Sequence, residues 1–415
     1  MTEPQITILA NGLRLASWAM PGLETAAVAL TADTGSRFEQ PAVNGLAHLF
    51  EHMVFKGTHR RSARAIAEEM EDVGGQLNAW TRRDTTMFHA RLLARDLGLG
   101  VDLIADLVTG ARFDLDDIVR EKEVVLQELG EARDTPDDIV FDHLQEAAFP
   151  GQALGRSILG DESTLARITR DDLLNWQAEH YATQRLTLVA TGKVDHDALC
   201  RMAEAAFPSP ASSSVAPSGE SVRFHPGRHH DARRIEQAQL TAGWAAPGHH
   251  DPAQDAALLF ALAAGGGMSS RLFQQVREER GLAYSVSASL QPYVDGGLLS
   301  VHAATDPKQA AAARDLIMTV LDETAAGLEQ AELNRARAQA VAGLLMALEG
   351  PQGAADYLGR SLTVHRRFVP PAELVSRIEA VNVDEARAAG AAMLAHPPAR
   401  AEIGRHKPAS PKAAA

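Results

Sequence analysis

The residues with the clearest chemical potential are His48, Glu51 and His52, which fall within five consecutive positions. On a helix these three positions share one face, because residues three and four apart are neighbours there. Two imidazoles one turn apart can bind a single Zn²⁺, and a carboxylate between them can reach a water molecule beside the ion. The spacing therefore predicts a hydrolytic zinc site.

A solvated surface helix is the alternative interpretation of this segment. The other residues between Leu46 and Phe55 are apolar, which favours a helix packed against a core. Burying three polar side chains there costs several kcal/mol unless they share a partner. A common metal ion is such a partner, so the apolar context favours the zinc interpretation.

A catalytic zinc site needs a third protein ligand. Glu121 and Glu128 are candidates on a predicted helix over residues 115–133, and a spacing of two helical turns puts them on the same face. One can bind the ion while the other orients a ligand from behind it. The spacing alone does not decide which carboxylate does which.

Composition limits the other classes of site. Cys200 is the only cysteine in the 415 residues, which excludes disulfide frameworks and thiolate metal sites within one chain. The net charge of −14 argues against binding to nucleic acid or to an anionic membrane surface. His229 and His230 lie in a polar segment and are expected to be solvated.

A domain boundary is predicted in the middle of the chain. Residues 208–221 are rich in Ser, Pro and Ala without apolar periodicity, which is typical of a linker. We expect an N-terminal zinc-binding domain over 1–207, a homologous C-terminal domain over 222–406 and a disordered tail over 407–415.

Both halves alternate strand and helix patterns in a similar order. Strands are predicted over 6–18 (a hairpin), 25–31, 77–80, 87–92, 186–192, 238–244, 284–290 and 298–304. Helices are predicted over 46–55, 62–73, 96–109, 115–133, 251–264, 270–279 and 307–326. The predicted fold class is α+β, with two homologous domains, each an antiparallel sheet packed with helices.

Several longer stretches resemble the M16 metallopeptidases, the inverzincins, and within them the processing-peptidase-like subfamily. The matching stretches are 45–58, 74–79, 121–128, 154–160, 270–273 and 280–286. They occur in both halves, so the resemblance covers most of the chain. It also implies a fold of two homologous domains.

The resemblance assigns roles around the zinc ion. The family places its third ligand 76 residues after the second histidine, which is Glu128 in this chain, and Glu121 falls on the family's accessory glutamate. One Zn²⁺ per chain is therefore expected on His48, His52 and Glu128. Glu51 is expected to be the general base that takes a proton from water.

The resemblance also assigns residues to the substrate. Arg277 and Tyr284 fall on the family's Arg/Tyr pair, whose donors can stabilise negative charge on the substrate carbonyl. Asn78 and Ala79 fall on the segment that faces the substrate, where an extended peptide adds a strand to the sheet edge. A turn residue is the alternative role for Asn78.

Asp138 and Asp142, four residues apart on a further predicted helix, fall where processing peptidases keep acids that bind an arginine near the cleavage site. Two carboxylates can hold a guanidinium through paired hydrogen bonds. The hypothesis is a preference for substrates with a basic residue close to the scissile bond. A solvated acidic helix is the alternative.

Together these residues predict a zinc-dependent endopeptidase that hydrolyses extended peptides or unfolded segments. The alternative is a non-catalytic or structural subunit of a heteromeric M16-type complex. In this subfamily the zinc half of one chain faces the Arg/Tyr half of another, and because this chain carries both, a homodimer is expected.

We see no signal peptide and no apolar stretch of the roughly 18 residues that a membrane span needs, so we expect a cytoplasmic protein.

Overall fold

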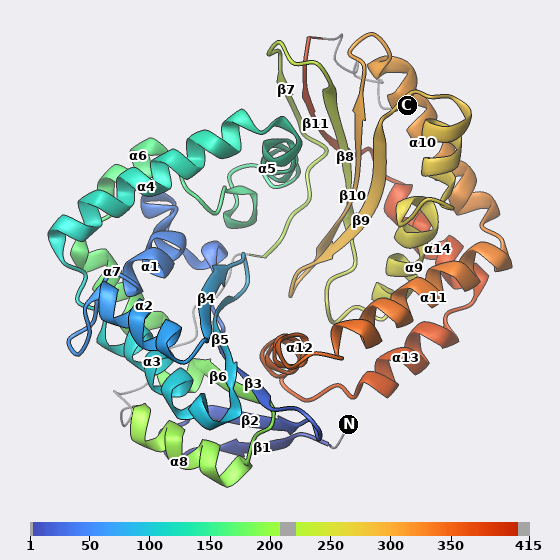
Figure 1. Cartoon of the computed structure of the whole chain (residues 1–415). Coiled ribbons are helices and arrows are strands. Elements are labelled where there is room, and N and C mark those ends of the chain that lie inside the picture. The colour runs from blue at the N-terminus through green and yellow to red at the C-terminus, as the bar shows by residue number, and fades with distance from the viewer. Residues whose placement is uncertain (1–2, 208–220, 406–415) are drawn as a thin grey trace. The chain divides into compact units, whose positions relative to one another are not determined.

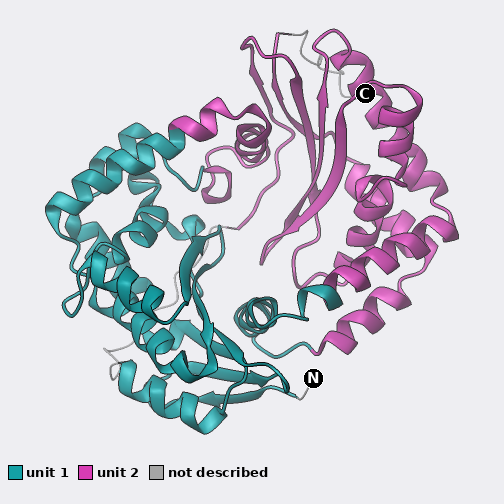
Figure 2. Ribbon diagram, in the orientation of Figure 1, with its two compact units in different colours: residues 1–129, 157–219, 345–369 teal, residues 130–156, 220–344, 370–415 magenta. Residues whose placement is uncertain are grey.

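The computed structural model describes residues 3–207 and 221–405, which fall into two compact units (Figure 2). Unit 1 comprises residues 1–129, 157–219 and 345–369, and unit 2 comprises residues 130–156, 220–344 and 370–415. Residues 208–220 of the predicted linker and the whole predicted tail, 407–415, lie outside the described residues. The units differ from the predicted halves in two segments, because 130–156 belongs to unit 2 and 345–369 to unit 1.

Unit 1 is built on a six-stranded sheet with the strand order β1-β2-β6-β3-β5-β4. Its strands are β1 (Gln5–Ile8), β2 (Arg14–Ala19), β3 (Thr25–Ala32), β4 (Gln76–Thr81), β5 (Thr86–Leu93) and β6 (Leu186–Gly192). The sheet is mixed, not purely antiparallel as expected, because β2 and β6 run parallel. A parallel pair needs a long crossover between its strands, and residues 20–185 provide it.

Helices cover both faces of this sheet (Figure 1). The helices of this unit are α1 (Leu46–Val54), α2 (Ala63–Asp72), α3 (Leu97–Gly110), α4 (Leu115–Asp134), α6 (Glu162–Arg167), α7 (Arg170–His180), α8 (His196–Ala206) and α12 (Pro351–Val364), and α4 continues past residue 129 into unit 2. Along β3, Val28 lies against Gly100 of α3, whereas Thr31 lies against Gly359 of α12. Since successive side chains of a strand point to opposite faces, α3 and α12 cover opposite sides of the sheet.

Unit 2 is built on a five-stranded sheet with the strand order β7-β11-β8-β10-β9. Its strands are β7 (Arg228–Asp231), β8 (Ala238–Ala246), β9 (Ser285–Pro292), β10 (Gly297–Thr305) and β11 (Ala399–Ile403). This sheet is also mixed, because the edge strand β7 runs parallel to β11. His229 and His230 were expected in a solvated polar segment, and their half-buried positions on β7 correct that expectation.

The helices of unit 2 again cover two faces of the sheet (Figure 1). The helices of this unit are α5 (Pro136–Ala148), α9 (Gln254–Gly265), α10 (Ala310–Gly327), α11 (Gln330–Ala347), α13 (Pro371–Ala380) and α14 (Val383–Leu394), with a π-helix over Phe273–Glu279. On β10, Leu299 packs in a core with Phe260 of α9, and the adjacent residue, Leu298, packs in a core with Leu144 of α5. The helix α5 therefore covers the face opposite to α9.

The two units thus exchange one helix each relative to the sequence halves. Helix α12 comes from the C-terminal half and covers the unit 1 sheet, while α5 comes from the N-terminal half and covers the unit 2 sheet. A linker located by composition cannot reveal this exchange, because both helices have the amphipathic pattern of any helix that covers a sheet.

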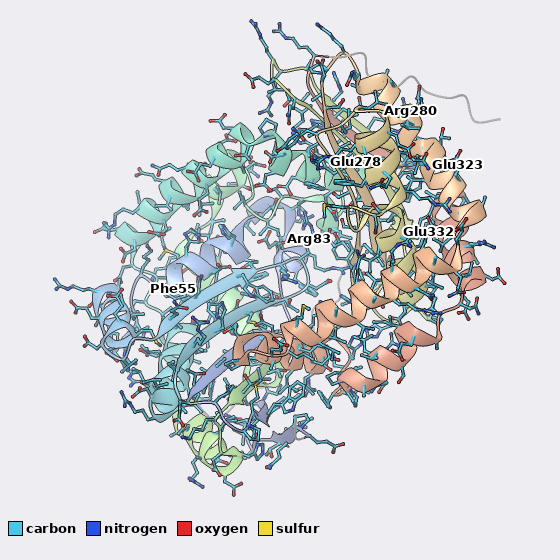
Figure 3. The ribbon with its side chains drawn as sticks, turned by 45° about the vertical axis from the view of Figure 1, so that its right-hand side comes forward. Phe55, Arg83, Glu278, Arg280, Glu323 and Glu332 are labelled. Atoms are coloured by element: carbon cyan, nitrogen blue, oxygen red, sulfur yellow. The ribbon has the colours of Figure 1, made fainter. Side chains whose placement is uncertain are left out.

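An ion pair fixes the start of the π-helix within unit 2. Arg271 donates two hydrogen bonds of 2.7 Å to the carboxylate of Glu332 on α11, which is labelled in Figure 3. The same guanidinium donates to the backbone carbonyl of Glu323 on α10 at 3.0 Å. The helix that carries Arg277 is therefore held against two long helices.

Most predicted elements are present with shifted ends. Ser62 caps α2, since its Oγ accepts a hydrogen bond of 3.1 Å from the backbone N–H of Ala65. Among the described residues, none of the helices is both long enough and apolar enough to cross a membrane.

Candidate metal centre

The helix α1 carries His48, Glu51 and His52, and a buried carboxylate fixes where it begins. Glu39 accepts hydrogen bonds from the backbone N–H groups of Gly45 at 2.9 Å and Ala47 at 2.7 Å. Negative charge at a helix N-terminus is stabilising, so Glu39 stabilises the first turn of α1.

The opposite face of α1 anchors it in the unit 1 core. Leu49, Phe50 and Met53 are buried. The ring of Phe50 stacks on that of Tyr181 with centroids 4.5 Å apart. The segment is therefore a helix with one face in the core, which is the arrangement that its apolar pattern favours.

Three donor groups converge on the polar side of α1. The His48 and His52 rings have centroids 4.6 Å apart, and their Nε2 atoms lie 3.8 Å and 3.6 Å from Oε2 of Glu128 on α4. One ligand atom from each residue lies within 4.8 Å of the others. The side chains of His48, His52 and Glu128 are 15%, 18% and 37% exposed, so the group is accessible to solvent.

Glu121 lies behind this group, two turns before Glu128 on α4. Its Oε2 is 3.2 Å from Nδ1 of His52, and its Oε1 is 2.8 Å from Nζ of Lys56. The carboxylate therefore engages the far nitrogen of the His52 ring and leaves Nε2 directed at Glu128. The spacing left open which glutamate lies with the histidine Nε2 atoms, and the fold places Glu128 there.

Glu51 lies beside the group and is held by a residue that the sequence analysis missed. Thr81, the last residue of β4, donates a hydrogen bond of 2.5 Å from Oγ1 to Oε2 of Glu51. Burial raises the pKa of Glu51, although the Thr81 hydrogen bond and the nearby His52 oppose that rise. The sequence offered one indication of this role: Thr81 directly follows the predicted strand 77–80, which was expected to face the substrate.

The electrostatics keep His48 uncharged. Burial and the neighbouring His52 lower the pKa of His48 to about 4. A neutral imidazole is the form that binds a metal ion, so His48 does not have to lose a proton first near neutral pH.

Asn78 and Ala79 lie on β4, which is an edge strand of the unit 1 sheet. Asn78 is exposed, and its Oδ1 accepts a hydrogen bond of 2.8 Å from the backbone N–H of Ala79. Both residues pair with β5 on the inner side, opposite His89 and Phe88. On its other side, β4 has no neighbouring strand among the described residues.

Arg277 and Tyr284 are brought together within unit 2. The guanidinium of Arg277 lies 5.6 Å from the centroid of the Tyr284 ring and 4.7 Å from that of Phe273. Its Nε lies 3.6 Å from Glu278, which is labelled in Figure 3. Tyr284 is 70% exposed, so its side chain is accessible. Phe273 is a neighbour that the sequence analysis did not single out.

Asp138 and Asp142 lie one turn apart on α5, in unit 2. Asp138 is exposed and Asp142 is half-buried. The helix predicted for them is present, and residues four apart on a helix can reach one cation on its surface.

Solved structures match the fold along nearly the whole chain. A crystal structure of a protease from Helicobacter pylori superposes with a TM-score of 0.90 at 18% identity, covering 97% of this chain and 99% of that one. A structure described as a peptidase M16 inactive domain from Pseudomonas fluorescens gives a TM-score of 0.84 at 21% identity, covering 99% and 100%. At these identities the likeness shows the fold.

Curated relatives are similar over most of their length. An uncharacterized zinc protease of Mycobacterium bovis is 36% identical over 409 residues, which is 97% of this chain and 93% of the relative. Another from Rickettsia bellii is 33% identical over 379 residues, 90% of each. A probable mitochondrial-processing peptidase subunit beta of Arabidopsis thaliana is 34% identical over 397 residues, 92% of this chain and 74% of the relative.

Two family descriptions match successive parts of the chain. Residues 14–162 match "Insulinase (Peptidase family M16)", and residues 167–340 match "Peptidase M16 inactive domain". The first match contains α1, β4 and α4, and the second contains Arg277 and Tyr284. The chain therefore belongs to the M16 peptidase family, with relatives named zinc proteases.

Proposed function

We propose that this protein is a zinc metalloendopeptidase that cleaves extended peptides or unfolded segments. The observation that carries the proposal is the convergence of His48, His52 and Glu128, with Glu51 beside them on the same helix face. Two imidazoles and one carboxylate form a donor set typical of catalytic zinc, with room for a further ligand.

The donor geometry fits one zinc ion. The three ligand atoms lie within 4.8 Å of one another, and Glu121 occupies the Nδ1 side of His52 so that Nε2 faces the shared position. When bound there, Zn²⁺ acts as a Lewis acid and makes water a stronger nucleophile near neutral pH.

Glu51 is the group on this chain that can move the proton. Its carboxylate lies next to the donor group, and the hydrogen bond from Thr81 holds it in one orientation. Because burial raises its pKa, it is a better proton acceptor than an exposed glutamate. In the proposed reaction it takes a proton from the attacking water and passes it to the leaving amine.

The substrate is proposed to bind along β4 as an added strand. An edge strand presents backbone N–H and C=O groups to an extended chain, whereas a folded protein rarely offers such a segment. Asn78 and Ala79 lie at the middle of β4 and would contact the peptide.

We propose a homodimer in which Arg277 and Tyr284 of one copy complete the zinc site of the other. The exposed Tyr284 and the adjacent Arg277 guanidinium are donors suited to a developing oxyanion. These residues and the zinc motif lie on one chain, so two identical copies can supply both parts.

Activity of the full-length chain on quenched fluorogenic peptides tests the central proposal. Hydrolysis is expected to disappear on treatment with a chelator and to return when Zn²⁺ is restored. A chain that binds zinc through His48 and His52 yet cleaves no peptide in a diverse library would favour a non-catalytic subunit.

Mixing two impaired variants tests the dimer. Glu51→Gln alone and Tyr284→Phe alone are each expected to have low activity, and co-expression should restore a part of it through mixed dimers. An active monomer, or mixtures no more active than their parents, would contradict the shared site.

A preference for a basic residue near the scissile bond is proposed on the Asp138 and Asp142 pair. Peptides in which arginine is replaced by norleucine should be cut more slowly. Equal rates for the two peptides would refute this preference without affecting the zinc mechanism.

A further inference from the structure

Unit 2 contains a second group of metal-binding side chains, none of which belongs to the zinc site proposed above. His143 and Glu146 lie on α5, and His229 lies on β7. One potential ligand atom from each residue lies within 4.8 Å of the others. The group thus joins a helix to the edge strand of the same unit.

The two imidazoles are already stacked. The His143 and His229 rings have centroids 3.9 Å apart and an angle of 13° between their planes. Two protonated rings at that distance would repel each other, whereas neutral rings have lone pairs available for a cation. Burial and the neighbouring His229 lower the pKa of His143 to about 4, which agrees with a neutral ring.

The helix geometry brings the carboxylate to the same place. His143 and Glu146 are three residues apart on α5, so both side chains lie on one side of the helix. Leu144 and Ala147 are buried against the sheet, while Glu146 is exposed. An exposed side chain of this length can change rotamer at little cost.

The surrounding charge favours a cation. The carboxylates of Asp142 and Asp231 lie near His143. Arg233 also lies near, but its Nε donates a hydrogen bond of 2.6 Å to Oδ2 of Asp231, which offsets its positive charge. The balance of these groups is negative.

We propose that His143, Glu146 and His229 form a second zinc site, which links α5 to β7. Ligand atoms about 2.1 Å from a tetrahedral ion lie roughly 3.4 Å apart. The present separations, which are within 4.8 Å, therefore have to shorten by at most about 1.4 Å. Two imidazoles and one carboxylate suit Zn²⁺ better than Mg²⁺ or Ca²⁺, which prefer oxygen ligands. The chain would then hold two zinc ions, where the sequence analysis expected one.

The place of this site in the fold points to a stabilising role. The strand β7 is only four residues long and lies at the edge of its sheet, paired with β11. The helix α5 reaches this sheet from the other half of the sequence. A metal ion between them would bind the folded state in preference to the unfolded chain and so stabilise both elements.

The test is a count of zinc equivalents on the full-length chain. The metal-free protein is titrated with Zn²⁺ against a chromophoric chelator, and the metal retained after desalting is measured by mass spectrometry. Wild-type protein should take two equivalents. His229→Gln should take one and keep its peptidase activity, because the site in unit 1 remains. His52→Ala should also take one equivalent.

His230→Gln is the matched control, because it is the next residue on β7 and its Nδ1 lies 4.0 Å from Glu402 on the neighbouring strand. It should take two equivalents like the wild type. The second equivalent should also raise the thermal midpoint of the wild type and His230→Gln but not of His229→Gln. A single equivalent on the wild type, or two on His229→Gln, would overturn the second site and leave the proposed peptidase activity intact.

Discussion

The two His/Glu groups have the same donor types but different surroundings. In unit 1, His48, His52 and Glu128 have Glu51 beside them and Glu121 behind them. In unit 2, the carboxylates of Asp142 and Asp231 lie near His143, and Arg233 pairs with Asp231. In the proposed function, the unit 1 residues divide three roles: the donors bind the ion, Glu121 orients His52 and Glu51 moves the proton.

The pKa of one histidine falls to about 4 in each group, with burial as the largest cause and a neighbouring histidine as the next. The proposed catalytic site and the proposed stabilising site therefore share their donor types and a depressed histidine pKa. The groups around the donors separate the two proposals, because hydrolysis needs a general base and an oriented ligand.

The largest expected difference is between the carboxylates Glu51 and Glu146. Glu51→Gln should lower kcat/KM by about 10² to 10⁴-fold, because it removes proton transfer while the amide keeps the shape of the side chain. Both zinc equivalents should remain. The measurement is peptide hydrolysis together with bound metal.

Glu146→Gln is the counterpart in unit 2. It should lose one zinc equivalent and leave kcat/KM nearly unchanged, because Glu146 is proposed as a ligand and not as a base. If Glu51→Gln retained wild-type turnover, the proposed difference between Glu51 as a general base and Glu146 as a metal ligand would be contradicted.

A smaller effect, on zinc affinity, is expected from Glu121, which lies next to His52 in unit 1. Glu121→Gln should weaken zinc binding in unit 1 by about 10- to 100-fold, because the neutral amide orients His52 less strongly than a carboxylate does. Competition with a chelator measures this affinity. Glu123→Gln, exposed on the same helix, is the control and should bind zinc normally. Equal zinc affinities of the two variants would show that Glu121 does not support zinc binding.

His180 belongs to neither group, and it shows that a histidine of low pKa can occur outside the metal-binding groups found among the described residues. His180 is 3% exposed, and its Nδ1 lies 2.7 Å from Oγ1 of Thr34. Burial, with a contribution from Arg185, lowers its pKa from 6.5 to about 3. The folded protein therefore keeps this ring neutral where the unfolded chain takes up a proton.

Stability should consequently fall as the pH drops below 6.5, by about 1.4 kcal/mol per pH unit from this group alone. His180→Asn keeps a hydrogen-bonding group near Thr34 but does not titrate, so urea unfolding should show a shallower loss of stability between about pH 5 and 6. An unchanged slope would mean that His180 is not neutral in the folded protein.

The smallest effect is expected at the hydrogen bond that positions Glu51. Thr81→Val removes the hydroxyl and should lower kcat/KM by about threefold to tenfold, as expected for the loss of one hydrogen bond to a carboxylate. Thr85→Val, in the turn that follows β4, is the control. The double variant Glu51→Gln/Thr81→Val should be no worse than Glu51→Gln, since Thr81 acts through that carboxylate. An additive loss would assign Thr81 a separate role.

Much of the unit 1 site could be predicted because its information is local. His48, Glu51 and His52 lie within about one helical turn, so the helix period alone brings them together. Glu121 and Glu128 were both candidates from their spacing, but which of them lies with the histidine Nε2 atoms depends on where the tertiary structure places α4. Thr81 escaped prediction because a threonine at a strand end has no chemical signature of its own.

The unit 2 group shows the opposite case. His143 and Glu146 are neighbours on a helix, but His229 lies on a short strand far along the chain. The polar residues around His229 concealed that strand, and nothing in the sequence pairs it with α5. Residues that meet only through the packing of a helix on a sheet leave no local pattern.

The sequence by itself determined most of the helices and strands, the face of α1 that carries the histidines and the residue types available to hold a metal. These follow from periodicity and composition, which act over a few residues. The tertiary structure decided the exchange of α5 and α12 between the units, the parallel pairs in both sheets and the meeting of His143 with His229. Such features depend on which apolar faces bury each other, and that choice is made between segments distant in the chain.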